Sequence, residues 1–406
     1  MSYRRISRRR RARRRAWRVG IALAAMLAVG GLIAGGTLAP PADGVAEHGA
    51  SIQPMTVADA VAAAASPSAS AEPRPSGDPP APAVQGRSPS PDAPPPVQVL
   101  AGHSAAVNAV AFSPDGRLIA SGGDDRKVIL WERAGARELL TLPPAPAAVA
   151  ALAFSPDGRF LAWSTGTVFA PGEAVPVIWL WDIAARRIAN KFVETPPDHH
   201  GAYSPRTLTF SPDGQTLAAG GDDRLIRLWD VGEGSLRGTL PGHADATTSL
   251  AFAADGLTLA SGGSDGEVKL WHLATGALAA TIPVSSRWVR AVVFAPDGKG
   301  LASAEEDRTI KLWDAASGRL LRTLSDQRWP RSLAFSPNGR ILISGGQDAL
   351  LKLWNPATGE LQRQVSGHTE PIFCVAYAPD GSSIVSGGAD NTVRLWNYER
   401  SSQVSR

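Results

Sequence analysis

The feature of this sequence that most restricts its fold is a block that occurs seven times. In residues 111–132, AFSPDGRLIASGGDDRKVILWE, an aromatic residue ends one strand. A Ser-Pro-Asp-Gly turn, an apolar strand, a Gly/Asp-rich turn and a strand ending in Trp follow. Pro presets φ and Gly supplies positive φ, so the first turn has a physical cause. The two aromatic markers of the copies are Phe112, Phe154, Phe210, Phe252, Phe294, Phe335 and Tyr377, and Trp131, Trp181, Trp229, Trp271, Trp313, Trp354 and Trp396.

The spacing of the copies predicts how many strands each one contains. Successive first markers lie 42, 56, 42, 42, 41 and 42 residues apart. Such a period accommodates four short strands and indicates a radial or solenoidal β array. No helical periodicity competes with it, so we predict an all-β body that occupies about three quarters of the 406 residues.

The charge of the chain is divided unevenly. Residues 1–18 contain ten Arg and no acidic residue, so the remaining residues contain 31 Lys and Arg against 37 Asp and Glu, a net charge of −6. An acidic repeat body lacks the clustered basic face that nucleic-acid binding requires, and we expect no nucleic acid among its partners. The single cysteine, Cys374, excludes an intramolecular disulfide and a cysteine-based metal cage.

The N-terminal segment has the charge pattern of a membrane anchor. Val19–Ala39 is 21 residues without a charge, which is long enough to cross a bilayer as a transmembrane helix. The preceding arginines should stay cytoplasmic, and no Lys or Arg follows until Arg74. We therefore expect an Arg-rich cytoplasmic tail at 1–18 and the repeats outside the cytoplasm. A cleaved secretory signal peptide is the alternative, and it would export the repeats as well.

Residues 40–96 are predicted to be a disordered linker. They contain 14 Pro among many Ala and Ser, and few large apolar side chains. Such a segment cannot bury enough surface to offset the entropy lost on ordering. The predicted domains are therefore the tail at 1–18, the transmembrane helix at 19–39, the linker at 40–96 and the repeat body at 97–400.

A third marker indicates the family. Gly-His dipeptides at 102–103, 242–243 and 367–368 precede their aromatic markers by the same number of residues, and Trp-Asp or Trp-Glu ends four of the copies. This pattern closely resembles the WD40 repeat family over residues 97–400. The resemblance implies a seven-bladed β-propeller, in which four-stranded antiparallel blades surround a central channel.

The two ends of the repeat body predict how the ring closes. The last copy has no fourth strand after Trp396, whereas residues 96–100, PVQVL, precede the first Gly-His as LQRQV precedes the last. The N-terminal strand should therefore complete blade seven. Closing the ring in this way removes exposed sheet edges that would otherwise promote aggregation.

The resemblance also implies a buried hydrogen-bond network of His, Ser, Asp and Trp in three blades. The matching residues are His103, Ser121, Asp125 and Trp131 in blade one, His243, Ser261, Asp265 and Trp271 in blade four, and His368, Ser386, Asp390 and Trp396 in blade seven. Three copies at one spacing indicate a structural network, because a Ser-His-Asp nucleophile site would be unique and open to a pocket. Blades five and six keep the Ser, Asp and Trp but lack the His. Blade three has Ala219 in the Ser place, and blade two departs furthest.

Blade two carries two insertions that form one candidate binding surface. They lie at 163–176 and 195–203, and in the family both loop types open on the same face, which we call the top face. The insertions would bring Phe169, His199, His200 and Tyr203 to a raised rim. Adjacent histidines point apart and no second cluster is visible, so we interpret them as a solvated loop and predict no metal site.

A second candidate surface comes from aligning the first strands. Six residues before the aromatic marker, blades five and six have Trp288 and Trp329. Four residues before it, blades three, five, six and seven have Arg206, Arg290, Arg331 and Phe373. By the family's geometry these positions surround the top entrance of the channel, and Trp and Arg are enriched at binding hot spots. The alternative is that the two tryptophans fill the space of the missing histidines in their own blades.

The sequence therefore predicts a non-catalytic scaffold, a membrane-tethered propeller outside the cytoplasm that binds a protein or peptide on its top face without a cofactor. The three arginines favour an acidic or otherwise anionic ligand. A propeller enzyme or small-molecule sensor that uses the channel is the alternative. No nucleophile elbow, metal-ligand spacing or phosphate loop in the sequence supports that alternative. A purely structural module is a third interpretation.

Overall fold

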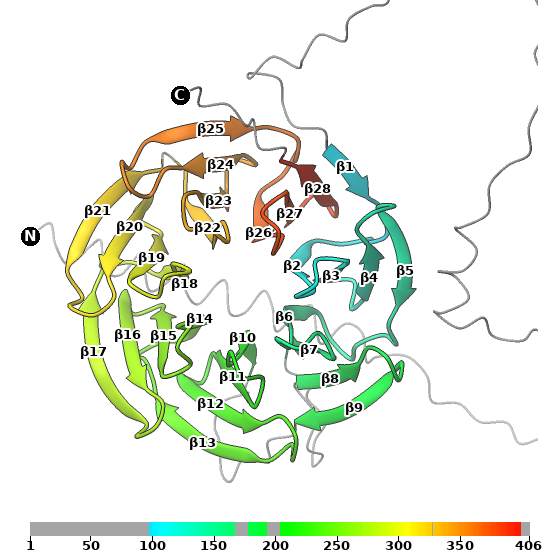
Figure 1. Ribbon diagram of the computed structural model, residues 1–406, viewed down its shortest axis with the longest axis horizontal. Coiled ribbons are helices and arrows are strands. Elements are labelled where there is room, and N and C mark those ends of the chain that lie inside the picture. The colour runs from blue at the N-terminus through cyan, green and yellow to red at the C-terminus, as the bar shows by residue number, and fades with distance from the viewer. Residues whose placement is uncertain (1–96, 167–177, 193–203, 327, 399–406) are drawn as a thin grey trace, which may run out of the picture. The chain divides into compact units, whose positions relative to one another are not determined.

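The computed structural model describes residues 97–166, 178–192, 204–326 and 328–398, which belong to one compact unit, Gly86–Arg406. These residues form seven four-stranded antiparallel sheets that are arranged as blades around a central channel (Figure 1). The sevenfold β-propeller predicted from the repeat is therefore confirmed. Each blade consists of four strands that are consecutive in the chain, except blade seven, which includes the N-terminal strand.

The strands occupy the same place in each blade. The first strands, around the channel, are β2 (Val107–Phe112), β6 (Val149–Phe154), β10 (Pro205–Phe210), β14 (Thr247–Phe252), β18 (Val289–Phe294), β22 (Pro330–Phe335) and β26 (Ile372–Tyr377). The second strands are β3 (Leu118–Gly123), β7 (Phe160–Thr165), β11 (Thr216–Gly221), β15 (Thr258–Gly263), β19 (Gly300–Glu305), β23 (Leu342–Gly346) and β27 (Ser383–Gly388). The third strands are β4 (Val128–Glu132), β8 (Ile178–Asp182), β12 (Leu225–Asp230), β16 (Glu267–His272), β20 (Thr309–Asp314), β24 (Leu351–Trp354) and β28 (Val393–Asn397). The outermost strands are β5 (Arg137–Thr141), β9 (Arg187–Phe192), β13 (Leu236–Pro241), β17 (Ala277–Pro283), β21 (Leu320–Ser325), β25 (Leu361–Val365) and β1 (Val97–Leu100).

The core lies between neighbouring blades, and this explains one glycine of the repeated Ser-Gly-Gly. Val149 and Leu152, on the first strand of blade two, pack against buried apolar residues of blade one. A Cβ added at Gly122 would lie only 2.4 Å from Val149 Cγ1. The second strand therefore needs glycine here because the first strand of the next blade approaches its backbone closely.

The ring closes as the sequence predicts. Strand β1 pairs antiparallel with β28, with Val97 opposite Trp396 and Leu100 opposite Val393. Leu100 is buried in a cluster that includes residues of blades one and seven. Blades one and seven are also joined by an ion pair of 2.9 Å between Arg133 Nη1 and Asp380 Oδ2. The outward edge of β28 is therefore covered by a fourth strand, as the third strand is in the other blades.

A β-bulge interrupts the pairing of the first and second strands at the same place in every blade. The bulged residue lies four positions before the aromatic marker, and these residues are Asn108, Ala150, Arg206, Thr248, Arg290, Arg331 and Phe373. A bulge leaves its extra residue outside the ladder and redirects its side chain. The candidate residues Arg206, Arg290, Arg331 and Phe373 are therefore all bulge residues at the top ends of strands around the channel.

The prediction for the first insertion of blade two was partly wrong. Trp163 is buried and belongs to β7, which continues to Thr165, so the enlarged turn begins later than 163. Residues 167–177 and 193–203 lie outside the described residues, as do the predicted tail, transmembrane helix and linker. Within the part of the chain that the structure describes, no helix is long and apolar enough to cross a membrane.

Candidate functional site

The four network residues of blade one are in hydrogen-bond contact. His103 Nε2 lies 2.8 Å from Ser121 Oγ, the Trp131 indole donates to the same oxygen at 2.8 Å, and His103 Nδ1 lies 3.0 Å from Asp125. A carboxylate can only accept, so Nδ1 carries the proton and Nε2 of the neutral ring accepts from Ser121. Burial lowers the pKa of His103, although Asp125 acts to raise it. The ring nitrogens of His103, the Ser121 hydroxyl and the Trp131 indole nitrogen thus all have hydrogen-bond partners while His103 is neutral.

Blades four and seven repeat the arrangement. The Ser Oγ lies 2.8 Å from His243 Nε2 and 2.7 Å from His368 Nε2, and each serine also accepts from the Trp of its blade. Ser121, Ser261 and Ser386 are fully buried, so their hydroxyl groups are not accessible to a substrate. His243, Asp265 and Glu267 have ligand atoms within 4.8 Å of one another, but His243 already contacts Asp265 and Ser261 through its two nitrogens. We therefore assign these groups a structural role.

Blade five replaces the missing histidine by an acid from its own second strand. Ser303 Oγ donates to Glu305 Oε1 at 2.9 Å, and Trp313 Nε1 donates to Ser303 at 2.8 Å. Glu305 is fully buried and is paired with Lys311. Burial raises the pKa of Glu305 to about 7, although the hydrogen bond and charge of Lys311 act to lower it. Sequence alignment missed this residue because Glu305 stands at a glycine position of the repeat.

Blade six uses a different substitute. Asp326 stands at the sequence position of the histidine and lies 3.4 Å from Ser344 Oγ. Lys352 is buried between Asp326 and Asp348, with 2.6 Å between Lys352 Nζ and Asp348 Oδ2. Burial acts to lower the pKa of Lys352, but its hydrogen bonds to the two carboxylates outweigh burial and raise it. The role of Asp326 could have been predicted from the sequence, because Asp326 precedes Phe335 by the same number of residues as His103 precedes Phe112.

Among the described residues, blades two and three show no counterpart of this network. Trp163 and Ala219 occupy the Ser places, and the buried indole nitrogens of Trp181 and Trp229 have no hydrogen-bond partner in the described part of the chain. Trp163 instead stacks on Trp179, with ring centroids 6.2 Å apart. Blade three instead has an ion pair of 2.6 Å between the buried Arg227 and Asp223.

The tryptophans at the channel entrance do not fill the histidine spaces. Trp288 and Trp329 expose 38% and 43% of their surface, and the space in their blades is occupied by Glu305 and Asp326. The space-filling interpretation of the two tryptophans is therefore wrong. Arg290 lies over the Trp288 ring, with its guanidinium carbon 4.5 Å from the ring centroid, so a cation covers one face of this exposed indole.

The three candidate arginines differ in their partners. Arg206 forms an ion pair with Asp222, and Arg290 forms one with Glu306. Arg331 has no carboxylate partner within the described residues and lies over the Phe373 ring at 4.2 Å. Burial and the charge of Arg290 lower the pKa of Arg331. Arg331 nevertheless remains a cation near neutral pH, because a guanidinium is effectively always protonated.

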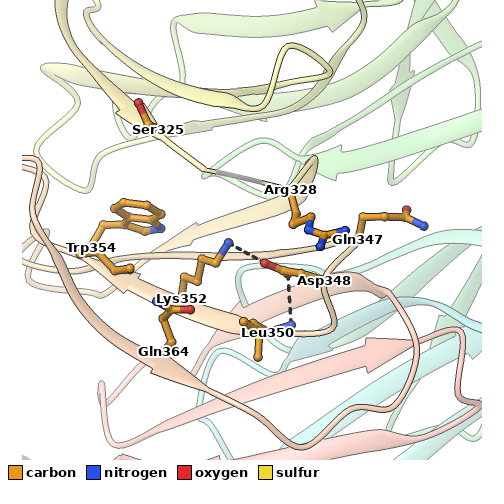
Figure 2. Close-up of a pocket in the computed structure, with 9 residues that line it drawn as sticks. Ser325, Arg328, Gln347, Asp348, Leu350, Lys352, Trp354 and Gln364 are labelled. Carbon is orange, nitrogen blue, oxygen red and sulfur yellow. Dashed lines mark hydrogen bonds and ion pairs between the residues drawn. The ribbon is translucent and has the colours of Figure 1, made fainter.

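Two adjoining pockets lie beside Trp329 at blade six. A pocket of about 290 Å³ is lined by Arg308, Arg328, Trp329 and Gln347. A pocket of about 600 Å³ shares Arg328 and Gln347 with it and is also lined by Ser325, Asp348, Leu350, Lys352, Trp354, Leu361 and Gln364. In Figure 2, Lys352 points toward Asp348, with Leu350 and Trp354 on either side of this pair. Sequence analysis identified Trp329 but not the other side chains of these pockets.

The candidate residues of the blade-two insertions cannot be placed. Phe169, His199, His200 and Tyr203 lie outside the described residues. Their role in partner binding remains a prediction from the sequence.

Comparison with known proteins gives two findings. A family model described as "WD domain, G-beta repeat" matches residues 94–132, 190–230, 234–272, 276–314, 318–355 and 359–397. The chain is also 32% identical over 133 residues to the small ribosomal subunit protein RACK1 of Drosophila melanogaster. That alignment covers 32% of this chain and 39% of the relative, so the chain spans about two fifths of the relative's length. The family matches leave out most of blade two, which is the blade that departs furthest from the repeat.

Proposed function

The chain belongs to the WD40 repeat family, and we propose that it is a non-catalytic scaffold that binds a protein or peptide on the top face of its propeller. WD40 propellers typically bind proteins. In this chain the rigid ring supplies the platform, while residues that differ between blades supply selectivity.

The observation that supports this proposal is the exposure of Trp288 and Trp329. Both are large aromatic residues at the channel entrance, and neither is needed to fill its own blade. Aromatic and arginine side chains carry much of the energy of protein interfaces because they combine contact area with directed polar groups. Trp288, Arg290, Trp329, Arg331 and Phe373 come from three consecutive blades, so they form one continuous candidate surface.

We propose further that the propeller is tethered to a membrane through Val19–Ala39 and lies outside the cytoplasm. The support is the uncharged stretch of 21 residues and the ten arginines that precede it. The full chain should resist extraction by alkaline carbonate, and protease added to intact spheroplasts should digest the propeller. Release of a shortened chain into the medium would instead support a cleaved signal peptide.

Partner binding can be tested by cross-linking in intact cells, followed by affinity recovery and mass spectrometry. We expect the wild-type chain to retrieve a defined extracytoplasmic protein, and the double variant Trp288→Ala/Trp329→Ala to lose it. The matched control is Leu139→Ala/Leu321→Ala, which removes two comparably exposed apolar side chains from the outermost strands β5 and β21. Equal recovery by the tryptophan variant and this control would contradict recognition at the channel entrance.

A further inference from the structure

In three of the seven blades, the bulge residue pairs with an acid in the turn that follows the second strand. Asn108 donates to Asp124 at 2.7 Å, Arg206 contacts Asp222, and Arg290 contacts Glu306. In each pair the partner lies 16 residues after the bulge residue. An acidic residue at this turn position therefore neutralises or binds the polar side chain on the bulge.

Blade six breaks this pairing. The residue 16 positions after Arg331 is Gln347, which is a neutral amide. Arg331 consequently has no carboxylate partner within the described residues, and its guanidinium instead lies over Phe373. Of the three arginines on bulges, Arg331 alone forms no ion pair with a carboxylate of the described residues, although the negative charge of Glu306 still acts on it.

Two further arginines lie at the same side of the channel. Arg308, a turn residue of blade five, lies over the Trp329 ring at 5.6 Å, and Arg328 immediately precedes Trp329. No described carboxylate forms an ion pair with either side chain, and both line the pocket of about 290 Å³. The walls of this pocket are thus two cations, one aromatic ring and one amide.

The adjoining pocket of about 600 Å³ has a different character. Its charged residues are Arg328, Lys352 and Asp348, and Lys352 is already held by Asp348 and Asp326. The apolar part of its wall consists of Leu350, Trp354 and Leu361. Two side-chain amides, those of Gln347 and Gln364, also line it. Together the two pockets offer positive charge next to a partly apolar recess. Figure 2 shows the larger of the two.

We propose that these two pockets bind an acidic peptide segment, in which carboxylate side chains flank an apolar one. The carboxylates would contact Arg308 and Arg328 in the smaller pocket, and the apolar side chain would enter the larger one. Arg331 lines neither pocket, but it follows Trp329 by two residues and would add positive charge beside them. Arginine pairs well with carboxylates because its planar fork can donate two parallel hydrogen bonds. A long polyanion such as nucleic acid fits less well, because the rest of the chain beyond residue 18 has a net charge of −6. The proposal rests on the top-face binding function and names the chemistry of its partner.

The preference for acid is tested with two fluorescein-labelled peptides and the full chain in detergent. We expect Glu-Glu-Leu-Glu-Glu to bind, measured by fluorescence anisotropy, and Gln-Gln-Leu-Gln-Gln to bind at least about tenfold more weakly. Equal affinities, or no binding at about 1 mM, would overturn the proposal. Competition by an oligothymidylate of equal charge with equal potency would overturn it too. None of these results would affect the test with Trp288 and Trp329, so the two proposals can fail separately.

The location is tested by restoring the missing acid. Gln347→Glu should pair with Arg331, as Glu306 pairs with Arg290, and should weaken binding of the acidic peptide about tenfold or more. The matched control is Ser264→Glu, which places an acid at the same turn position of blade four, 16 residues after Thr248. Glu306→Gln, which frees Arg290, should leave binding unchanged or strengthen it. Equal weakening by Gln347→Glu and Ser264→Glu, with thermal unfolding unchanged, would show that the peptide does not bind at blade six.

Discussion

Ser303 Oγ lies 2.9 Å from Glu305 Oε1, and this contact takes the place of the Ser to His contact of blades one, four and seven. In blade four the two solutions exclude each other. A Cβ at Gly263, the counterpart of Glu305, would lie 2.3 Å from His243 Nδ1. Blade six combines Asp326 with a glycine at this position, so blade five is the one described blade with a network serine in which an acid of the second strand reaches that serine.

This exclusion predicts that Gly263→Ala destabilises the propeller. The new methyl group would also lie 2.4 Å from Asp265 Oδ1, so the His243 network would have to shift, at a cost of about 1 to 3 kcal/mol. The control is Gly238→Ala on β13, where no atom lies within 4 Å of the added Cβ. Urea unfolding of the full chain measures both. Equal unfolding free energies for the two variants would contradict the close packing of His243 on Gly263.

Glu305→Gln should remove one component of the pH dependence of stability. The pKa of Glu305 is raised from 4.5 to about 7, so the folded state holds a proton that the unfolded chain releases earlier. This contribution to stability is fully present below pH 4.5 and is lost as the pH rises through about 7. The unfolding free energy of the wild type minus that of the variant should therefore fall by on the order of 1 to 3 kcal/mol across this range.

The histidines act in the opposite direction and must be separated from this effect. Burial lowers the pKa of His103 and His368 below 6.5, so their contribution is present above pH 6.5 and is lost as the pH falls. Both histidines are present in the wild type and in Glu305→Gln, so their effect cancels in the difference. A difference that stayed constant between about pH 4 and about pH 8 would contradict the raised pKa of Glu305.

Ser121→Ala should destabilise blade one although it removes only one atom. The Trp131 indole nitrogen and His103 Nε2 would both lose the Ser121 hydroxyl in a buried site. Leaving buried polar groups unpaired costs about 1 to 3 kcal/mol. Ser104→Ala, at an exposed position of the same blade, should change the unfolding free energy by less than about 0.5 kcal/mol. Similar unfolding midpoints for the two variants would argue against the network.

Strand β1 should contribute to the stability of the whole ring. Leu100→Ala removes a buried side chain from the cluster between blades one and seven, and we expect a loss of about 2 to 5 kcal/mol. Val99→Ala on the same strand is the control, because Val99 is exposed and should have little effect. Deletion of residues 97–100 should be more severe, since it leaves the outward edge of β28 unpaired. Unchanged thermal unfolding of the deletion variant would contradict closure by β1.

The repeat made much of the propeller predictable from the sequence. The turn after Phe112 would be weak evidence for a β-hairpin if it occurred once. Because the same pattern occurs seven times, it indicates a repeated β-sheet unit. The partners of His103, His243 and His368 were implied by the resemblance to the WD40 family, whose network residues match this sequence at the same spacing in three blades. The closing strand was predictable because residues 96–100 match the segment before Gly367-His368.

The differences between blades were decided by the tertiary structure. A sequence pattern shows that blades five and six lack a histidine, but whether Trp288, Glu305 or Asp326 fills the space depends on where each side chain points. The β-bulge at Arg331 does not alter the spacing of the markers, so the spacing does not reveal it. Local spacing thus determined the common blade, whereas the exposed tryptophans, the unpaired arginine and the pockets at blade six arise from contacts between neighbouring blades and turns.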